Sequence, residues 1–125
     1  MVIQSQTFTF KDSQGNEIYV YKWMPNTAPR AIVQIAHGMV ETAERYERLA
    51  LALTKEGYGV YANDHLGHGR TAKTSDDVGH FEADAFNISV KVLQQLTGII
   101  KQENPSLDVY LMGHSMGSFM VQKYI

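Results

Sequence analysis

The fold of this chain is decided by the stretch VYLMGHSMG, residues 109–117. Its first four residues are apolar, which predicts a strand that is buried on both faces. The apolar residues 119–121 that follow the stretch predict one face of a helix. Ser115 therefore lies on a sharp turn between a strand and a helix. Gly113 and Gly117 let the flanking backbones approach each other where a Cβ would clash.

A serine on such a turn can act as a nucleophile. Its hydroxyl is a poor nucleophile at neutral pH, so it must be presented to a base while hydrogen-bond donors face the substrate. The pattern G-x-S-x-G between a strand and a helix is typical of a nucleophile elbow. The amino end of the helix adds backbone amides and a positive dipole end, which favour a developing oxyanion. We therefore predict that Ser115 is the attacking residue.

A second turn, His37-Gly38-Met39, follows an apolar, β-branched run at residues 31–36 that predicts another buried strand. A glycine in this place permits a tight turn that aims a backbone N–H at the nucleophile. We predict that the amides of Met39 and Met116 are the two oxyanion donors. The ring of His37 is predicted to support the loop and not to act as the general base.

A third loop, residues 63–71, follows the second buried strand, which is predicted at residues 58–62. Gly67 and Gly69 belong to a segment, residues 67–72, that matches the dinucleotide pattern G-x-G-x-x-A. However, a polar stretch follows it in place of a helix, and no later strand ends in an acidic residue at the expected distance. This alternative is therefore weak, and we interpret the glycines as supporting a loop.

The same loop is rich in histidine, which raises the alternative of a metal site. His65, His68 and His80 are the candidate ligands. No carboxylate-rich set at metal-ligand spacing joins them, so we expect no metal. Asp64 is expected to make structural hydrogen bonds to the loop.

The amino-terminal segment predicts a β-hairpin. Apolar residues alternate at residues 8–10 and again at residues 18–23, and a turn cluster at residues 12–16 separates the two runs. We expect two antiparallel, half-exposed strands.

Helical periodicity fills the gaps between the buried strands. One apolar stripe runs through residues 46–53 and a longer one through residues 85–100, with Asp84 as the predicted N-cap. A further helix begins at about Met116. The order after the hairpin is therefore βαβαβ, which predicts an α/β fold with a mainly parallel sheet and helices on both faces.

Composition excludes several classes of protein. The chain has 125 residues, 44% of them hydrophobic, with a formal net charge of −2 and no cysteine. No block of basic residues favours a nucleic-acid partner. Residues 1–7 lack the features of a signal peptide, and no apolar run approaches the roughly 20 residues of a transmembrane helix. We expect a single domain in the cytoplasm.

Three motifs together resemble those of the monoacylglycerol lipase and lysophospholipase group of α/β-hydrolases, which are of the serine aminopeptidase S33 type. They are His37-Gly38-Met39, the loop DHLGHGR at residues 64–70, and Gly113-His114-Ser115-Met116-Gly117. The resemblance implies hydrolysis of a carboxylic ester of a lipid through an acyl-enzyme, with transient contact to lipid surfaces. It implies no metal and no organic cofactor. Leu66 and Thr71 depart from the common pattern of arginine and serine.

The resemblance also implies that catalytic groups lie outside this sequence. In α/β-hydrolases the acid and the base histidine follow the serine, whereas this chain ends ten residues after Ser115. Residues 1–125 are therefore expected to form the N-terminal half of a single α/β-hydrolase domain, without its lid and C-terminal half, and to show little turnover alone. Two alternatives stay open: a noncatalytic module that self-associates, and another activity of the fold such as a thioesterase, peptidase or haloperoxidase.

Overall fold

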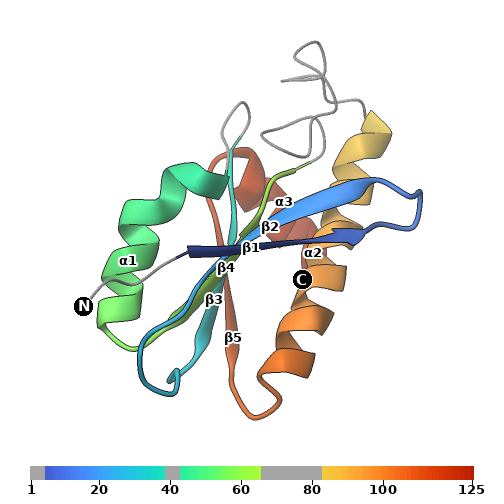
Figure 1. The fold of residues 1–125 in the computed structure, drawn as a ribbon. Helices are drawn as coiled ribbons and strands as arrows, with labels where there is room; N and C mark the ends of the chain where they lie inside the picture. The colour runs from blue at the N-terminus through green and yellow to red at the C-terminus, as the bar shows by residue number, and fades with distance from the viewer. Residues whose placement is uncertain (1–4, 39–42, 66–82) are drawn as a thin grey trace.

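A five-stranded sheet with helices on both faces forms the fold (Figure 1). The structure, a computed structural model, describes residues 5–38, 43–65 and 83–125. The predicted α/β class is confirmed. In chain order the elements are β1 (Ser5–Lys11), β2 (Glu17–Trp23), β3 (Ile32–Ala36), the 3-10 helix η1 (Ala43–Tyr46), α1 (Glu47–Lys55), β4 (Gly59–Asn63), α2 (Ala83–Glu103), β5 (Val109–Gly113) and α3 (Met116–Tyr124).

The strands lie in the order β1-β2-β4-β3-β5. The hairpin β1–β2 is antiparallel, as predicted, and β2 also pairs antiparallel with β4. The other three strands are parallel, with β3 in the middle. Their carboxyl ends meet at one edge of the sheet, where Ala36 is the register partner of Gly113. The turns after β3, β4 and β5 therefore gather at one place.

The second strand of the hairpin is more buried than expected. Ile18 and Val20 are fully buried, but Tyr21 and Trp23 on the opposite face are only 5% and 1% exposed. The expectation of a half-exposed strand was wrong, because β2 continues the main sheet beside β4. Its second face is covered by the core cluster that includes Ala43 and residues of α1.

The helices cover both faces of the sheet (Figure 1). Helix α1 packs on one face and ends just before Gly57, whose φ of 92° favours glycine. Helices α2 and α3 pack on the other face, where Leu93 and Met120 are fully buried. Asp84 was predicted as the N-cap of α2 but lies inside the helix as described. Among the described residues, no helix is both long and apolar enough to cross a membrane.

A buried polar contact joins α2 to β3. The Thr97 hydroxyl lies 2.6 Å from Gln34 Oε1 and 2.9 Å from the Leu93 carbonyl, and Gln34 Nε2 donates to that carbonyl at 2.9 Å. Gln34 is fully buried and Thr97 is 6% exposed. These bonds satisfy a glutamine that would otherwise be costly at the centre of the sheet.

The last strand differs from its prediction. β5 was expected to be covered on both faces, yet Tyr110 is 57% exposed and the rest of the strand is at most half-buried. Within the part of the chain that the structure describes, β5 pairs with β3 alone and forms an edge of the sheet. An apolar composition therefore predicted the strand but not its place in the sheet.

Candidate active site

Ser115 stands between β5 and α3 in an unusual backbone conformation. Its φ is 55° and its ψ is −118°, and it is the only residue other than glycine with a positive φ in the described ranges. Such a conformation is costly for a residue with a Cβ and persists only where the surrounding structure enforces it. The side chain is exposed and makes no capping hydrogen bond to the helix. The turn thus presents a hydroxyl at the amino end of α3.

Two glycines make this turn sterically possible. A Cβ on Gly113 would lie 2.5 Å from the Gly117 carbonyl oxygen and 2.7 Å from the Ser118 Cα. A Cβ on Gly117 would lie 2.7 Å from the His37 carbonyl oxygen. All three distances are below the 3.0 Å that real Cβ atoms essentially never cross. The elbow is therefore packed against itself and against the end of β3.

Hydrogen bonds reinforce the same contacts. The His114 amide donates to the Ala36 carbonyl at 3.1 Å, which extends the β3–β5 pairing to the elbow. The amides of Gly117 and Ser118 donate to the carbonyls of His114 and Ser115, both at 2.9 Å. The turn before α3 is therefore held by its own backbone and by β3.

The turn after β3 is held by the ring of His37. This side chain is 1% exposed, and its Nδ1 lies 2.7 Å from the carbonyl oxygen of Gly38. Met39, a predicted oxyanion donor, lies outside the described residues. Met116, the other predicted donor, is the first residue of α3. The next two amides of α3, those of Gly117 and Ser118, already donate to the carbonyls of His114 and Ser115, so they are not free to bind an anion.

The sequence did not reveal that the loop after β4 meets the turn after β3. The His65 amide donates to His37 Nε2 at 2.9 Å, and His65 Nε2 lies 2.9 Å from the His37 carbonyl oxygen. Asp64, fully buried, accepts the Ala43 amide at 2.8 Å. The only available signal was topological, because residues that follow neighbouring parallel strands end at the same edge. The predicted loop residues Gly67 and Gly69, and the alternative metal ligands His68 and His80, lie outside the described residues.

This arrangement contains some, but not all, of the groups that nucleophilic chemistry requires. An exposed hydroxyl stands at a helix amino terminus, beside a tight turn on the neighbouring strand. Among the described residues, no hydrogen bond joins the Ser115 hydroxyl to a histidine or a carboxylate. The activating base of such a serine is thus not seen within these ranges.

Two of the hollows that the described residues form lie at opposite ends of the parallel strands. One, of about 410 Å³, lies beside the elbow and is lined by Arg45, Tyr46, Met112, Gly113 and His114. It adjoins the residue before Ser115, so it is the hollow that could receive part of a substrate.

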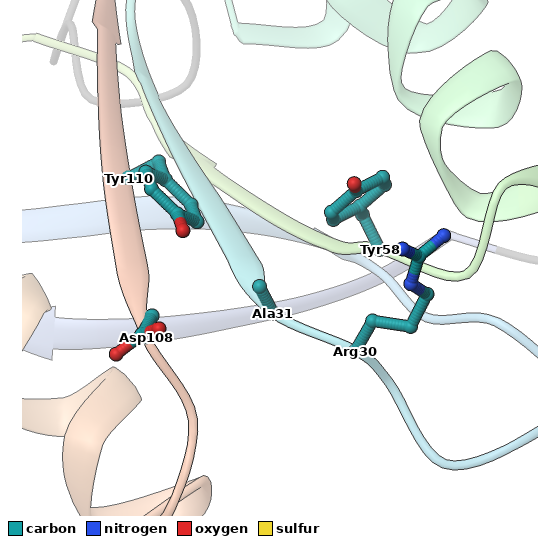
Figure 2. Close-up of a pocket in the computed structure, with 5 residues that line it drawn as sticks. All are labelled: Arg30, Ala31, Tyr58, Asp108 and Tyr110. Carbon is teal, nitrogen blue, oxygen red and sulfur yellow. The ribbon is translucent and has the colours of Figure 1, made fainter.

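The second hollow, of about 390 Å³, lies at the amino ends of the parallel strands (Figure 2). Its lining includes Ala31 before β3 and Asp108 before β5, and the Arg30 guanidinium lies over the Tyr58 ring, 5.3 Å from its centroid. This hollow is at the far end of the sheet from Ser115. It therefore plays no part in chemistry at the serine.

Known proteins resemble this chain in sequence and in fold. Residues 27–125 match the family described as serine aminopeptidase, S33. A monoglyceride lipase homolog of monkeypox virus is 38% identical over 104 residues, which are 81% of this chain and 35% of that protein. A monoacylglycerol lipase of Mycolicibacterium smegmatis is 35% identical over 119 residues, which are 93% of this chain and 40% of that protein.

A solved structure shows the same architecture. The thermostable carboxyl esterase of Bacillus coagulans superposes with a TM-score of 0.87 at 31% identity, covering 98% of this chain and 40% of the esterase. The chain thus spans well under half the length of the relatives that it matches. The resemblance expected from the three motifs is confirmed. This chain belongs to the serine aminopeptidase S33 family of α/β-hydrolases.

Proposed function

We propose that this chain carries the nucleophile of a serine hydrolase that cleaves carboxylic esters of lipids, such as a monoacylglycerol or a lysophospholipid. The observation that carries the proposal is the conformation of Ser115, whose φ of 55° presents an exposed hydroxyl at the amino end of α3. A strained turn of this kind is the recurrent setting of a nucleophilic serine. Relatives named as monoacylglycerol lipases support the substrate class.

In the proposed reaction, Ser115 Oγ attacks the ester carbonyl and gives up its proton to a base. The negative charge that develops on the carbonyl oxygen is held by the backbone amides of Met39 and Met116. Collapse of this intermediate breaks the ester bond, releases the alcohol with a proton, and leaves the acyl group on Ser115. Water then attacks the acyl-enzyme, releases the fatty acid and restores the serine.

The base and the acid of this reaction are proposed to lie downstream of Ser115 in chain order, as in other α/β-hydrolases. Within the described residues, both His37 and His65 have a ring nitrogen engaged with the backbone, and the Asp64 carboxylate accepts a backbone amide. We therefore expect residues 1–125 alone to turn over ester substrates slowly or not at all. Residual catalysis of about 1000- to 10,000-fold over water, from the oxyanion donors and binding, is compatible with this view.

The remaining parts of the proposal come from the sequence. The enzyme is proposed to act in the cytoplasm without a metal or an organic cofactor, and to contact lipid surfaces transiently when it takes up substrate.

The substrate class is tested by hydrolysis assays on the protein that carries this sequence. A monoacylglycerol, a lysophospholipid, an acyl thioester and an aminoacyl amide are offered in parallel. We expect fatty-acid release from one of the two lipid esters, lost in Ser115→Ala and kept in the matched control Ser118→Ala. Preferential cleavage of the thioester or the amide would assign the chain to another activity of this fold.

A second candidate function is a noncatalytic module that self-associates. The exposed edge of β5, with Tyr110 57% exposed and Phe119 on α3 64% exposed, favours it. An uncovered strand edge is prone to pair with another chain. Sedimentation of the chain as a dimer, together with no esterase activity in any form of the protein, would favour this candidate over the hydrolase.

A further inference from the structure

We propose that Asp64 and His65, which follow β4, are positioning residues that hold the turn after β3 and the start of η1. Asp64 holds Ala43, the first residue of η1, and His65 holds Gly38 through the His37 ring. The inference rests on the proposed function, because Gly38 precedes Met39, the proposed oxyanion donor.

The Asp64 contact fixes the start of η1. Ala43 begins helix η1, and its amide donates to Asp64 Oδ1 at 2.8 Å. Both residues are fully buried. A hydrogen bond from a backbone amide to a buried carboxylate is among the stronger kinds in proteins, because water does not compete for it. The first residue of η1 is therefore tied to the end of β4.

The His65 contacts fix the turn after β3. The His65 amide is a donor, so His37 Nε2 must accept from it at 2.9 Å. A neutral imidazole then carries its proton on Nδ1, which lies 2.7 Å from the Gly38 carbonyl oxygen and donates to it. In return, His65 Nε2 donates to the His37 carbonyl oxygen at 2.9 Å. The centroids of the two rings lie 3.9 Å apart, and both histidines are 1% exposed.

The same bonds fix the turn after β3. The His37 ring holds the Gly38 carbonyl, and His65 decides which His37 nitrogen carries the proton. His65 therefore acts on this turn through His37.

The same residues connect this turn to the elbow. The His37 carbonyl oxygen that accepts from His65 is the atom that a Cβ on Gly117 would approach to 2.7 Å. The first turn of α3 thus packs against the His37 carbonyl group, which accepts a hydrogen bond from the His65 side chain. His65 is therefore placed to set the distance between the nucleophile and the turn after β3.

The first test is spectroscopic and does not depend on activity. Two-bond proton–nitrogen correlation spectra of the protein labelled with nitrogen-15 in histidine report which ring nitrogen carries the proton. We expect opposite neutral tautomers, with the proton on Nδ1 in His37 and on Nε2 in His65. A proton on Nε2 of His37, or on Nδ1 alone in His65, would contradict the inference even if Ser115 proves to be the nucleophile.

The second test is kinetic and uses paired variants in the protein that carries this sequence. His65→Leu removes the ring donor, whereas His65→Gln offers an amide Nε2 in its place. Asp64→Ala removes the acceptor, whereas Asp64→Asn keeps Oδ1. On a water-soluble p-nitrophenyl ester, we expect His65→Leu and Asp64→Ala to lower kcat by at least ~10-fold with little change in KM, and the conservative variants to recover most of it. Complete loss of one oxyanion donor lowers kcat about 100- to 1000-fold, and this sets the upper limit for the decrease expected in these variants.

A control separates positioning from loss of stability. Thr97→Val removes a buried hydrogen bond between α2 and Gln34 of β3, which involves neither turn. It should lower the melting temperature while leaving kcat nearly unchanged. If Thr97→Val lowers kcat as much as His65→Leu at an equal loss in melting temperature, or if His65→Gln recovers nothing, Asp64 and His65 do no more than stabilise the fold. Activity that survives Ser115→Ala would instead contradict the proposed function and leave the tautomer result valid.

Discussion

Gly117, in the first turn of α3, packs directly against the carbonyl group of Ala36 at the end of β3. A Cβ on Gly117 would lie 2.5 Å from the Ala36 carbonyl carbon, a distance that real side chains do not reach. Both partners are backbone, so neither can move aside as a flexible side chain could. This contact fixes the serine turn against the strand beside it.

Gly117→Ala should therefore destabilise the protein strongly. Overpacking costs about 1–3 kcal/mol in ordinary cores and more where the neighbour is rigid, so we expect about 3 kcal/mol or more from urea unfolding. The matched control is Gly98→Ala in α2, where a Cβ meets nothing within 4 Å. It should raise the free energy of unfolding by about 0.5–1 kcal/mol, because alanine favours a helix. Equal effects of the two substitutions would show that the close packing at the elbow is absent.

Thr97→Val should cost more stability than Thr54→Val. The Thr97 hydroxyl is the donor within reach of Gln34 Oε1 in β3, whereas the Thr54 hydroxyl donates to the Leu51 carbonyl of its own helix. Leaving a buried acceptor unsatisfied costs about 1–3 kcal/mol, and losing a bond to a helix carbonyl costs less. Thermal unfolding of both variants measures the difference, and a larger loss in Thr54→Val would contradict the described contact.

A charged cluster joins β2, β4 and the end of α2, away from the serine. Glu103 Oε1 accepts from the Tyr61 hydroxyl at 2.5 Å and from Lys22 Nζ at 3.3 Å. Burial and the bond to Glu103 raise the pKa of Tyr61 above its ordinary 10.0. For Lys22, burial lowers the pKa, but the bonds and charges of Tyr61 and Glu103 outweigh it and raise the pKa above 10.5.

This cluster predicts a loss of stability in alkaline solution. Both pKa values are higher in the folded than in the unfolded state, so the folded state holds more protons above about pH 10. The contribution of Tyr61 and Lys22 is present below pH 10 and declines as the pH rises through their folded pKa values. The free energy of unfolding of Tyr61→Phe should fall less steeply with pH than that of the wild type. The control Tyr110→Phe, outside the cluster, should keep the wild-type slope; equal slopes for all three proteins would contradict the account.

Much of the fold followed from local pattern. The continuous apolar runs predicted β3 and β4, and the turn residues between alternating strands predicted the hairpin. The burial of Tyr21 and the exposure of Tyr110 could not be predicted in the same way. Both depend on which strand lies beside which, and that order is a property of the whole sheet. A run of apolar residues looks the same in a central strand and at an edge.

The candidate site could also be predicted only where a local pattern marks it. The serine turn could be located because glycine, serine and glycine at fixed spacing are required by the turn itself. The contact between His37 and His65 joins residues 28 positions apart and exists only because β3 and β4 are parallel neighbours. No local pattern marks such a pair. The contact between the Asp64 carboxylate and the Ala43 amide on η1 was likewise not predicted from the sequence.

The central claim is tested most directly by covalent labelling of the nucleophile. The protein that carries this sequence is treated with a fluorophosphonate and the modified peptide is identified by mass spectrometry. We predict a single adduct on Ser115 Oγ, present in Ser118→Ala and absent in Ser115→Ala. An adduct that persists in Ser115→Ala, or that forms on a different residue of the wild type, would contradict the assignment of Ser115 as the nucleophile.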